Sequence, residues 1–167
     1  MKILIATSEA VPFAKTGGLA DVCGALPIEL ARLGHESALI LPAYRNVQYC
    51  GLPIERLGID FIVPIGSKTV TGHLLQARLP EVDVPVYLVE QDQYYDRDDL
   101  YGTDGKDYID NCERFVFFCR AVMEAIRLLD LQVDVVHAND WQTGLLPAYL
   151  QAEYRGVPGY EQIVSLF

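Results

Sequence analysis

Residues 3–22 combine an apolar strand, a glycine turn and the start of a helix, and this combination limits the possible folds most strongly. Residues 3–6 are apolar without alternation, which is typical of a parallel strand covered on both faces. Gly17 and Gly18 end a Lys-Thr-Gly-Gly turn, where the backbone can bend sharply and approach a ligand. The following helix offers N–H groups and the positive end of its dipole, and Lys15 adds a full charge. The stretch predicts an anion site; the alternative is an ordinary loop with a solvated lysine.

Strands and helices alternate along the rest of the chain, which predicts an α/β fold. The expected architecture is a Rossmann-like, mostly parallel sheet with helices on both faces. Two short strands at 61–65 and 69–79 predict a β-hairpin inserted at an edge of the sheet, after a loop-like region at 43–60. The other expected strands are 3–6, 37–41, 84–90, 133–137 and 162–167, and the expected helices are 19–33, 107–131 and 143–154.

Three loops follow predicted strands, at 8–21, 91–107 and 137–142. The carboxyl ends of parallel strands lie at one edge of a sheet, and ligands of such sheets bind beyond that edge. We therefore expect the three loops to open on the same side of the molecule.

The bulk composition excludes several classes of partner. The net charge of −10 argues against non-specific binding to nucleic acid and against docking on an anionic membrane. No stretch approaches the roughly 20 apolar residues of a membrane span. The four scattered cysteines predict free thiols in a reducing compartment, and hence a cytoplasmic location.

Asp96-Arg97-Asp98 has the spacing of a D-x-D metal motif, which some sugar transferases use. Three-residue patterns of this kind are common by chance. An arginine between two carboxylates suits an ion pair better than a metal cage, so an ion pair is the favoured interpretation.

The stretch His137-Ala-Asn-Asp-Trp follows a predicted strand and is a second candidate site. Asn139 or Asp140 could instead cap the helix that opens near Thr143. Both interpretations can hold at once.

Several stretches together resemble the bacterial glycogen synthases and plant starch synthases. The first signature of that family matches 15–22 followed by 24–27, and the second matches 134–145. Between them, 95–97 and 110–115 also fit the family pattern. The resemblance runs over nearly the whole chain with its motifs in the expected order.

The resemblance implies a GT-B glycosyltransferase, with two Rossmann-like domains around a cleft. The implied reaction is retaining transfer of glucose from ADP-glucose to the non-reducing end of an α-1,4-glucan (glycogen or starch), without a metal or other cofactor. Lys15 would contact the phosphates of the donor, with the Gly17-Gly18 backbone against the same region. The resemblance implies catalytic roles for Asp21 and Asp140 and substrate contacts for Lys15, Gly17, Gly18, Glu9, Tyr95, His137 and Asn139.

The chain also departs from the family pattern. Asn139 and Gln142 stand where many bacterial members have histidine. The family's Thr-x-His-Asn motif and nucleotide-binding domain would lie beyond Phe167, so we expect a truncated N-terminal, acceptor-side domain spanning 1–167. Such a fragment should be inactive alone and could self-associate through an exposed sheet edge. The alternatives are a non-catalytic module that binds a nucleotide sugar or glucan, and a related GT-B enzyme that uses UDP-glucose.

Overall fold

A seven-stranded sheet with the order β3-β4-β5-β2-β1-β8-β9 forms the centre of the molecule. The structure is a computed structural model and describes residues 1–79 and 81–167. The strands from β5 to β9 in this order are parallel, which confirms the expected fold class. They are β5 (Val84–Glu90), β2 (Glu36–Pro42), β1 (Lys2–Ala6), β8 (Val135–Ala138) and β9 (Val164–Leu166).

The expected hairpin is present at one edge of the sheet. It consists of β3 (Glu55–Ile65) and β4 (Lys68–Leu79), which are antiparallel to each other, and β4 is also antiparallel to β5. The prediction of a loop up to residue 60 was wrong, because β3 begins at Glu55. A bulge between Arg56 and Ile59 places Gly58 at φ 68° and breaks the alternation that would have revealed the strand.

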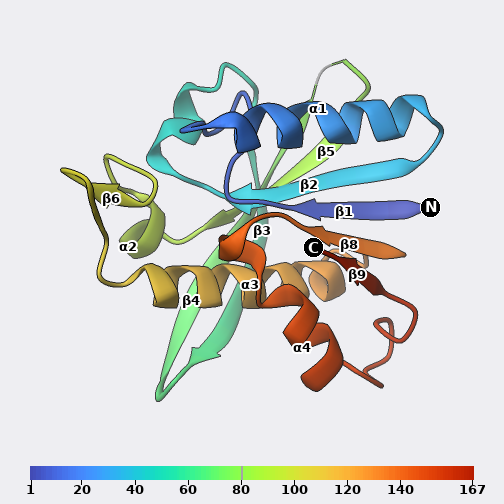
Figure 1. Cartoon of the computed structure of the whole chain (residues 1–167). Helices are drawn as coiled ribbons and strands as arrows, with labels where there is room; N and C mark the ends of the chain where they lie inside the picture. Colours follow the sequence, from blue (N-terminus) through green and yellow to red (C-terminus); the bar gives the residue numbers. More distant parts are fainter. Residues whose placement is uncertain (80) are drawn as a thin grey trace.

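Helices cover both faces of the sheet (Figure 1). The helix α1 (Gly18–Arg32) lies on one face, and α3 (Asn111–Leu128) and α4 (Leu146–Ala152) lie on the other. Pro27 lies within α1 without ending it. Gly34, at φ 86°, follows the last turn of α1 and donates its N–H to Ala31 O.

Short elements occupy the remaining loops. They are the 3₁₀ helices η1 (Arg45–Tyr49) and η2 (Trp141–Thr143), the helix α2 (Asp92–Tyr95), and the paired strands β6 (Gly102–Thr103) and β7 (Lys106–Asp107). Two predicted helix starts were therefore several residues early. β7 and Asp110 precede α3, and η2 precedes α4, whose Pro147 is tolerated in the first turn because its missing N–H would have no partner there.

The core lies between the sheet and the helices. The apolar face of α3 is buried, including Phe115, Phe117 and Phe118. All four cysteines are free thiols. Among the described residues, no helix has the length and apolar character needed to cross a bilayer.

Candidate functional site

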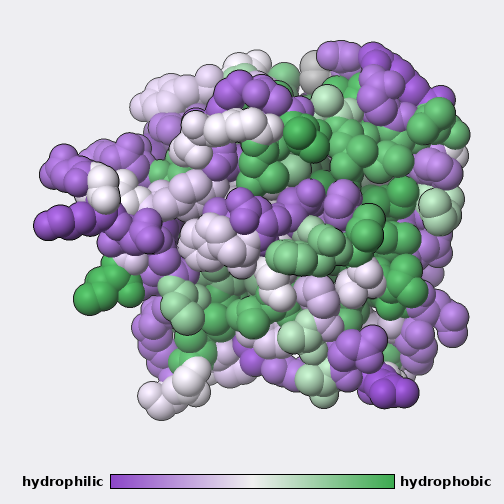
Figure 2. All heavy atoms as spheres, viewed as in Figure 1, coloured by the Kyte–Doolittle hydropathy of each residue, from purple (hydrophilic) through white to green (hydrophobic). Residues whose placement is uncertain are grey.

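The three loops predicted to share one edge of the sheet do meet there. The hydroxyl of Tyr101 lies 2.8 Å from both Ser8 Oγ and Glu9 Oε1, which joins the loop after β5 to the loop after β1. The Tyr101 ring centroid is 6.2 Å from that of Trp141, in the loop after β8. Hydrophilic side chains gather over the protruding loops at the left of the view (Figure 2).

Glu9 lies beneath the glycine turn and organises it. Its side chain is buried, and its carboxylate accepts hydrogen bonds from Thr16 N at 2.5 Å, Thr16 Oγ1 at 2.6 Å and Gly17 N at 3.2 Å. The N–H groups of Thr16 and Gly17 are therefore already engaged. The N–H groups in the first turn of α1, from Gly18 onward, are those that can face an anion.

The outer side of the turn is open. A Cβ atom built on Gly17 or Gly18 meets no atom within 4 Å. The N-cap residue of α1 is Gly17, which has no side chain to cap the helix, so the N–H groups of the first turn from Gly18 onward have no N-cap side-chain acceptor. Space and partial positive charge thus coincide at this point.

Lys15 supplies the full positive charge of the site. Its Nζ lies 2.5 Å from Asp21 Oδ1, and both side chains are about half exposed. Exposed pairs of this kind contribute about 1 kcal/mol or less, so a phosphate could draw the ammonium away from Asp21 at small cost. Lys15 and Thr16 also line a cavity of about 390 Å³ that extends to Tyr101 and Gly102.

Glu9 is ionised at neutral pH. Burial raises the pKa of its carboxyl, but the hydrogen bonds from Thr16, Tyr101 and Gly17 outweigh burial and lower the pKa below its usual value. Glu9 is therefore an acceptor of hydrogen bonds and not a proton donor.

Asp140 caps η2, as one of the two interpretations of its motif predicted. Its Oδ1 accepts a hydrogen bond from Trp141 N at 2.7 Å. Its backbone lies at φ 64° and ψ 173°, a region that residues other than glycine rarely occupy. Strain of this kind is concentrated at functional sites, which keeps the second interpretation open.

Asn139 and His137 have mainly structural contacts in this structure. Asn139 Nδ2 donates to Ala6 O at 3.2 Å and to His137 O at 3.0 Å, which ties the end of β8 to the end of β1. Partial burial lowers the pKa of His137, so the imidazole is neutral at physiological pH.

Tyr95, for which the resemblance implies a substrate contact, does not reach the surface of the candidate site. Its side chain is fully buried, and its hydroxyl donates to Arg114 O at 2.9 Å. The single turn of α2 directs Tyr95 inward, where its ring packs edge-on against Tyr44 with the centroids 5.6 Å apart. Tyr101 is the loop tyrosine that reaches the site, and the sequence analysis missed it.

The D-x-D residues are occupied by an arginine from another element. Arg45 binds Asp98 and also Asp96, the latter through Nε at 2.6 Å. Arg97 pairs instead with Asp110, at 2.5 Å, so the expected ion pair exists with different partners. Within the described part of the chain, no group of three potential metal ligands is present.

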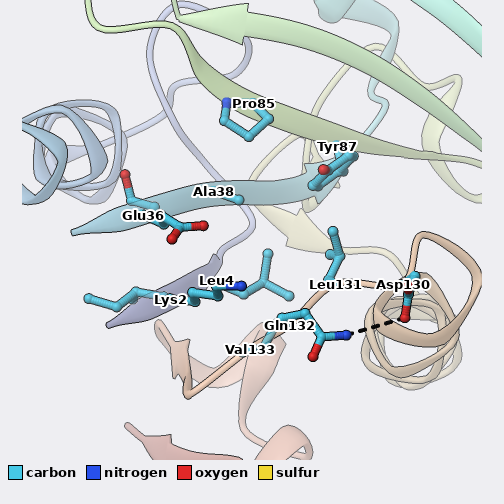
Figure 3. A pocket seen from close by; sticks show the side chains of 12 residues that line it. Lys2, Leu4, Glu36, Ala38, Pro85, Tyr87, Asp130, Leu131, Gln132 and Val133 are labelled. Carbon is cyan, nitrogen blue, oxygen red and sulfur yellow. Dashed lines mark hydrogen bonds between the residues drawn. The ribbon is translucent and has the colours of Figure 1, made fainter. Parts of the chain in front are cut away.

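A separate hollow of about 270 Å³ lies at the amino ends of β1 and β2 (Figure 3). Leu4, Ala38 and Tyr87 line it, and Gln132 donates to Asp130 at 3.3 Å beside it. Since the three loops lie at the carboxyl ends of these strands, this hollow is at the opposite edge of the sheet from the candidate site.

Known proteins resemble this chain over nearly its whole length. The family model for the starch synthase catalytic domain matches residues 2–167. The chain is 52% identical over 160 residues to a glycogen synthase of Syntrophotalea carbinolica, covering 96% of this chain and 33% of that protein. It is 45% identical over 175 residues to a glycogen synthase of Rhodopirellula baltica, covering 99% of this chain and 34% of that protein. The chain thus spans about a third of the length of these relatives.

A solved structure agrees with these matches. The catalytic domain of starch synthase IV from Arabidopsis thaliana, bound to ADP and acarbose, superposes with a TM-score of 0.83 and 27% sequence identity. The match covers 98% of this chain and 32% of that one. With the family model, the relatives and the fold in agreement, the chain belongs to the family of the starch synthase catalytic domain.

Proposed function

We propose that a protein of the relatives' length carrying this sequence is a glycogen or starch synthase. It transfers glucose from ADP-glucose to the non-reducing end of an α-1,4-glucan with retention of configuration. The observation that carries this proposal is the family match over residues 2–167. The donor and acceptor are supported by the starch synthase IV structure, whose ligands are ADP and acarbose.

The site chemistry suits the departure of a nucleoside diphosphate. Breaking the glycosyl–phosphate bond leaves negative charge on the diphosphate, and fixed positive groups that meet this charge lower the barrier. Lys15 and the first turn of α1, from Gly18 onward, are the groups that do so here. A single well-placed donor is worth about 3–4 kcal/mol in other enzymes.

The other residues for which the resemblance implies a role complete the proposed site. Asp140 lies in the active centre, and Asp21 holds the Lys15 ammonium before the donor binds. Gly17 contributes open space rather than a free N–H, since Glu9 accepts that N–H. We place His137 and Asn139 beside the substrate at the end of β8.

The reaction proceeds without a metal ion, because a lysine and a helix N-terminus supply the positive charge. The chain acts as the acceptor-side N-terminal domain of a two-domain GT-B enzyme and does not transfer glucose by itself. Its free cysteines support a reducing compartment such as the cytoplasm.

The test uses a protein that carries this sequence and is as long as the relatives. Its incorporation of glucose into glycogen is measured with ADP-glucose and with UDP-glucose. Lys15→Gln removes the charge and keeps a polar side chain only one atom shorter, and should lower kcat/KM for ADP-glucose about a hundredfold. Lys68→Gln is the matched control, because Lys68, at the start of β4 in the distant hairpin, is also half exposed and pairs with Glu113 of α3 at 2.7 Å.

Three results would contradict the proposal. Unchanged kinetics in Lys15→Gln would remove the phosphate role of this lysine. A preference for UDP-glucose would change the donor. Binding of the nucleotide sugar without transfer would make the protein a binding module.

A further inference from the structure

Glu9 combines two properties that conflict at an anion site. Its carboxylate is ionised, yet it lies directly under the turn where we place the donor's diphosphate. A negative charge there opposes anion binding, so its place needs another physical reason. Four donor groups converge on this one carboxylate, namely Thr16 N, Thr16 Oγ1, Gly17 N and the Tyr101 hydroxyl.

From this geometry, and resting on the proposed function, we infer that Glu9 is a positioning residue that sets the Lys15–Gly18 turn for the diphosphate of the donor. It acts as a hydrogen-bond acceptor and its charge is incidental to that role. By engaging the N–H groups of Thr16 and Gly17, it orients the turn so that the first turn of α1 and Lys15 face the open side.

The donors divide into two kinds, which makes the inference testable. The N–H groups of Thr16 and Gly17 both lie on Oε2 and can only donate. The hydroxyls of Thr16 and Tyr101 both lie on Oε1 and can either donate or accept. A glutamine with its amide oxygen at the Oε2 position would keep both N–H bonds while its NH₂ group donates to the hydroxyls. An alanine would leave the two N–H groups without their acceptor.

Tyr101 extends the same arrangement to the loop after β5. That loop is itself anchored to α3, since Arg114 Nη2 donates to Leu100 O at 2.9 Å and Asn111 Nδ2 donates to Tyr101 O at 2.8 Å. Arg114 is fully buried, so its hydrogen bond to Leu100 O is shielded from water. The turn is therefore positioned by α3 through Tyr101 and Glu9.

Amide hydrogen exchange on this chain tests the positioning role independently of activity. The Thr16 and Gly17 amides should be protected in the unsubstituted chain. Glu9→Ala should lower their protection about tenfold or more, because a buried acceptor is lost, and Glu9→Gln should keep it within about threefold. Glu113→Ala is the matched control, since Glu113 also accepts from a tyrosine and a second residue, Tyr94 and Lys68, far from the turn.

The affinity for ADP, measured by calorimetry on the protein of the relatives' length, tests the consequence. Glu9→Ala should raise the Kd about tenfold, whereas Glu9→Gln should leave it within threefold or lower it, since a negative charge has gone. Tyr101→Phe keeps the ring packing and removes one donor, and should reduce the protection of Thr16 and Gly17 by a smaller factor. If Glu9→Ala does not fold, Tyr101→Phe replaces it as the test of the positioning role.

The outcomes separate the two proposals. Protected Thr16 and Gly17 amides in Glu9→Ala would overturn the positioning role, and so would unchanged protection in Tyr101→Phe if Glu9→Ala fails to fold. If Glu9→Gln lost as much amide protection as Glu9→Ala, the positioning role would also be overturned, because the loss of the negative charge would then explain the effect. Failure of the unsubstituted protein to bind ADP would overturn the proposed function and with it the role of the turn toward the diphosphate.

Discussion

Asp140 shows two opposing effects within one residue. Its carboxylate caps η2 through Trp141 N, and its backbone has the left-handed φ of 64° that favours glycine. The cap stabilises the structure by about 1 kcal/mol, and the backbone conformation costs about 1–3 kcal/mol. Substitutions can separate the two effects, because glycine and alanine both lack the carboxylate and differ in their tolerance of this conformation.

We predict that Asp140→Ala lowers the free energy of unfolding by about 1–2 kcal/mol, because the cap is lost and the strain remains. Asp140→Gly should lower it by less or raise it, because the strain is relieved as well. Urea unfolding of both variants measures the difference. A larger loss in the glycine variant would show that the conformation is not strained.

The residues of the candidate site were predicted with mixed success, for reasons that lie in their contacts. Lys15, Gly17 and Gly18 lie between a strand and the first residue of a helix, so local pattern placed them correctly at the turn. Tyr95 and Tyr101 lie in one aromatic loop, and local pattern could not show that α2 turns Tyr95 into the core while Tyr101 reaches Glu9.

At the scale of elements, α1 packs unusually closely against the loop that precedes it. A Cβ atom on Gly24 would lie 2.4 Å from Val11 Cγ2 and 2.9 Å from Val11 O. We predict that Gly24→Ala lowers the free energy of unfolding by about 1–3 kcal/mol, because the helix must move away from the loop.

Gly17→Ala is the matched control for Gly24→Ala, since the space beside Gly17 is open and its φ of −149° suits any residue. Its stability should stay within about 0.5 kcal/mol of the unsubstituted chain, as judged by urea unfolding. If the two variants were equally stable, α1 and the loop at Val11 would be able to move apart at little cost in free energy.

The loop after β5 is joined to the start of α3 by a two-pronged ion pair. Arg97 Nη1 and Nη2 donate to the two oxygens of Asp110 at 2.8 and 2.5 Å. These hydrogen bonds lower the pKa of Asp110 against the opposing effect of burial. Because the pKa is lower in the folded state, the pair stabilises the fold above the unfolded-state pKa, and this stability is lost as the pH falls through the folded-state pKa.

We predict that Asp110→Asn lowers the free energy of unfolding at neutral pH by about 1–2 kcal/mol. The difference in unfolding free energy from the unsubstituted chain should narrow as the pH falls from the ordinary carboxyl pKa of 3.8 through the lower folded-state pKa of Asp110, because the native carboxylate is then protonated. Urea unfolding at neutral and acid pH checks this. Asp98→Asn is the control, since the Asp98 carboxylate is 85% exposed. If the difference in unfolding free energy between Asp110→Asn and the unsubstituted chain did not depend on pH, the account would be contradicted.

Predicting the elements from sequence succeeded where the pattern was regular. The helix expected over 107–131 and the strand expected over 69–79 are present as α3 and β4. The starts of β3 and α3 were wrong, because they depend on a bulge at Gly58 and on the pairing of Arg97 with Asp110, which are long-range or irregular features.

At the scale of the whole molecule, the sheet ends in an exposed strand. Among the described residues, β9 pairs only with β8, and Val164, Leu166 and Phe167 are more than half exposed. An exposed apolar edge strand is a template for pairing with another chain. We predict that this chain self-associates, with a sedimentation-derived mass that rises with concentration.

A charged residue on β9 provides the control for self-association. Leu166→Lys should reduce it, because edge lysines block strand pairing. A mass that stays monomeric at all concentrations in the unsubstituted chain would contradict the prediction.

The most direct test of the central claim is the position of ADP in a crystal structure of the protein of the relatives' length. The account predicts the diphosphate against the first turn of α1, with the Lys15 ammonium moved from Asp21 to a phosphate oxygen and the Thr16 and Gly17 N–H groups still on Glu9. A diphosphate bound elsewhere, with Lys15 still paired to Asp21, would contradict it.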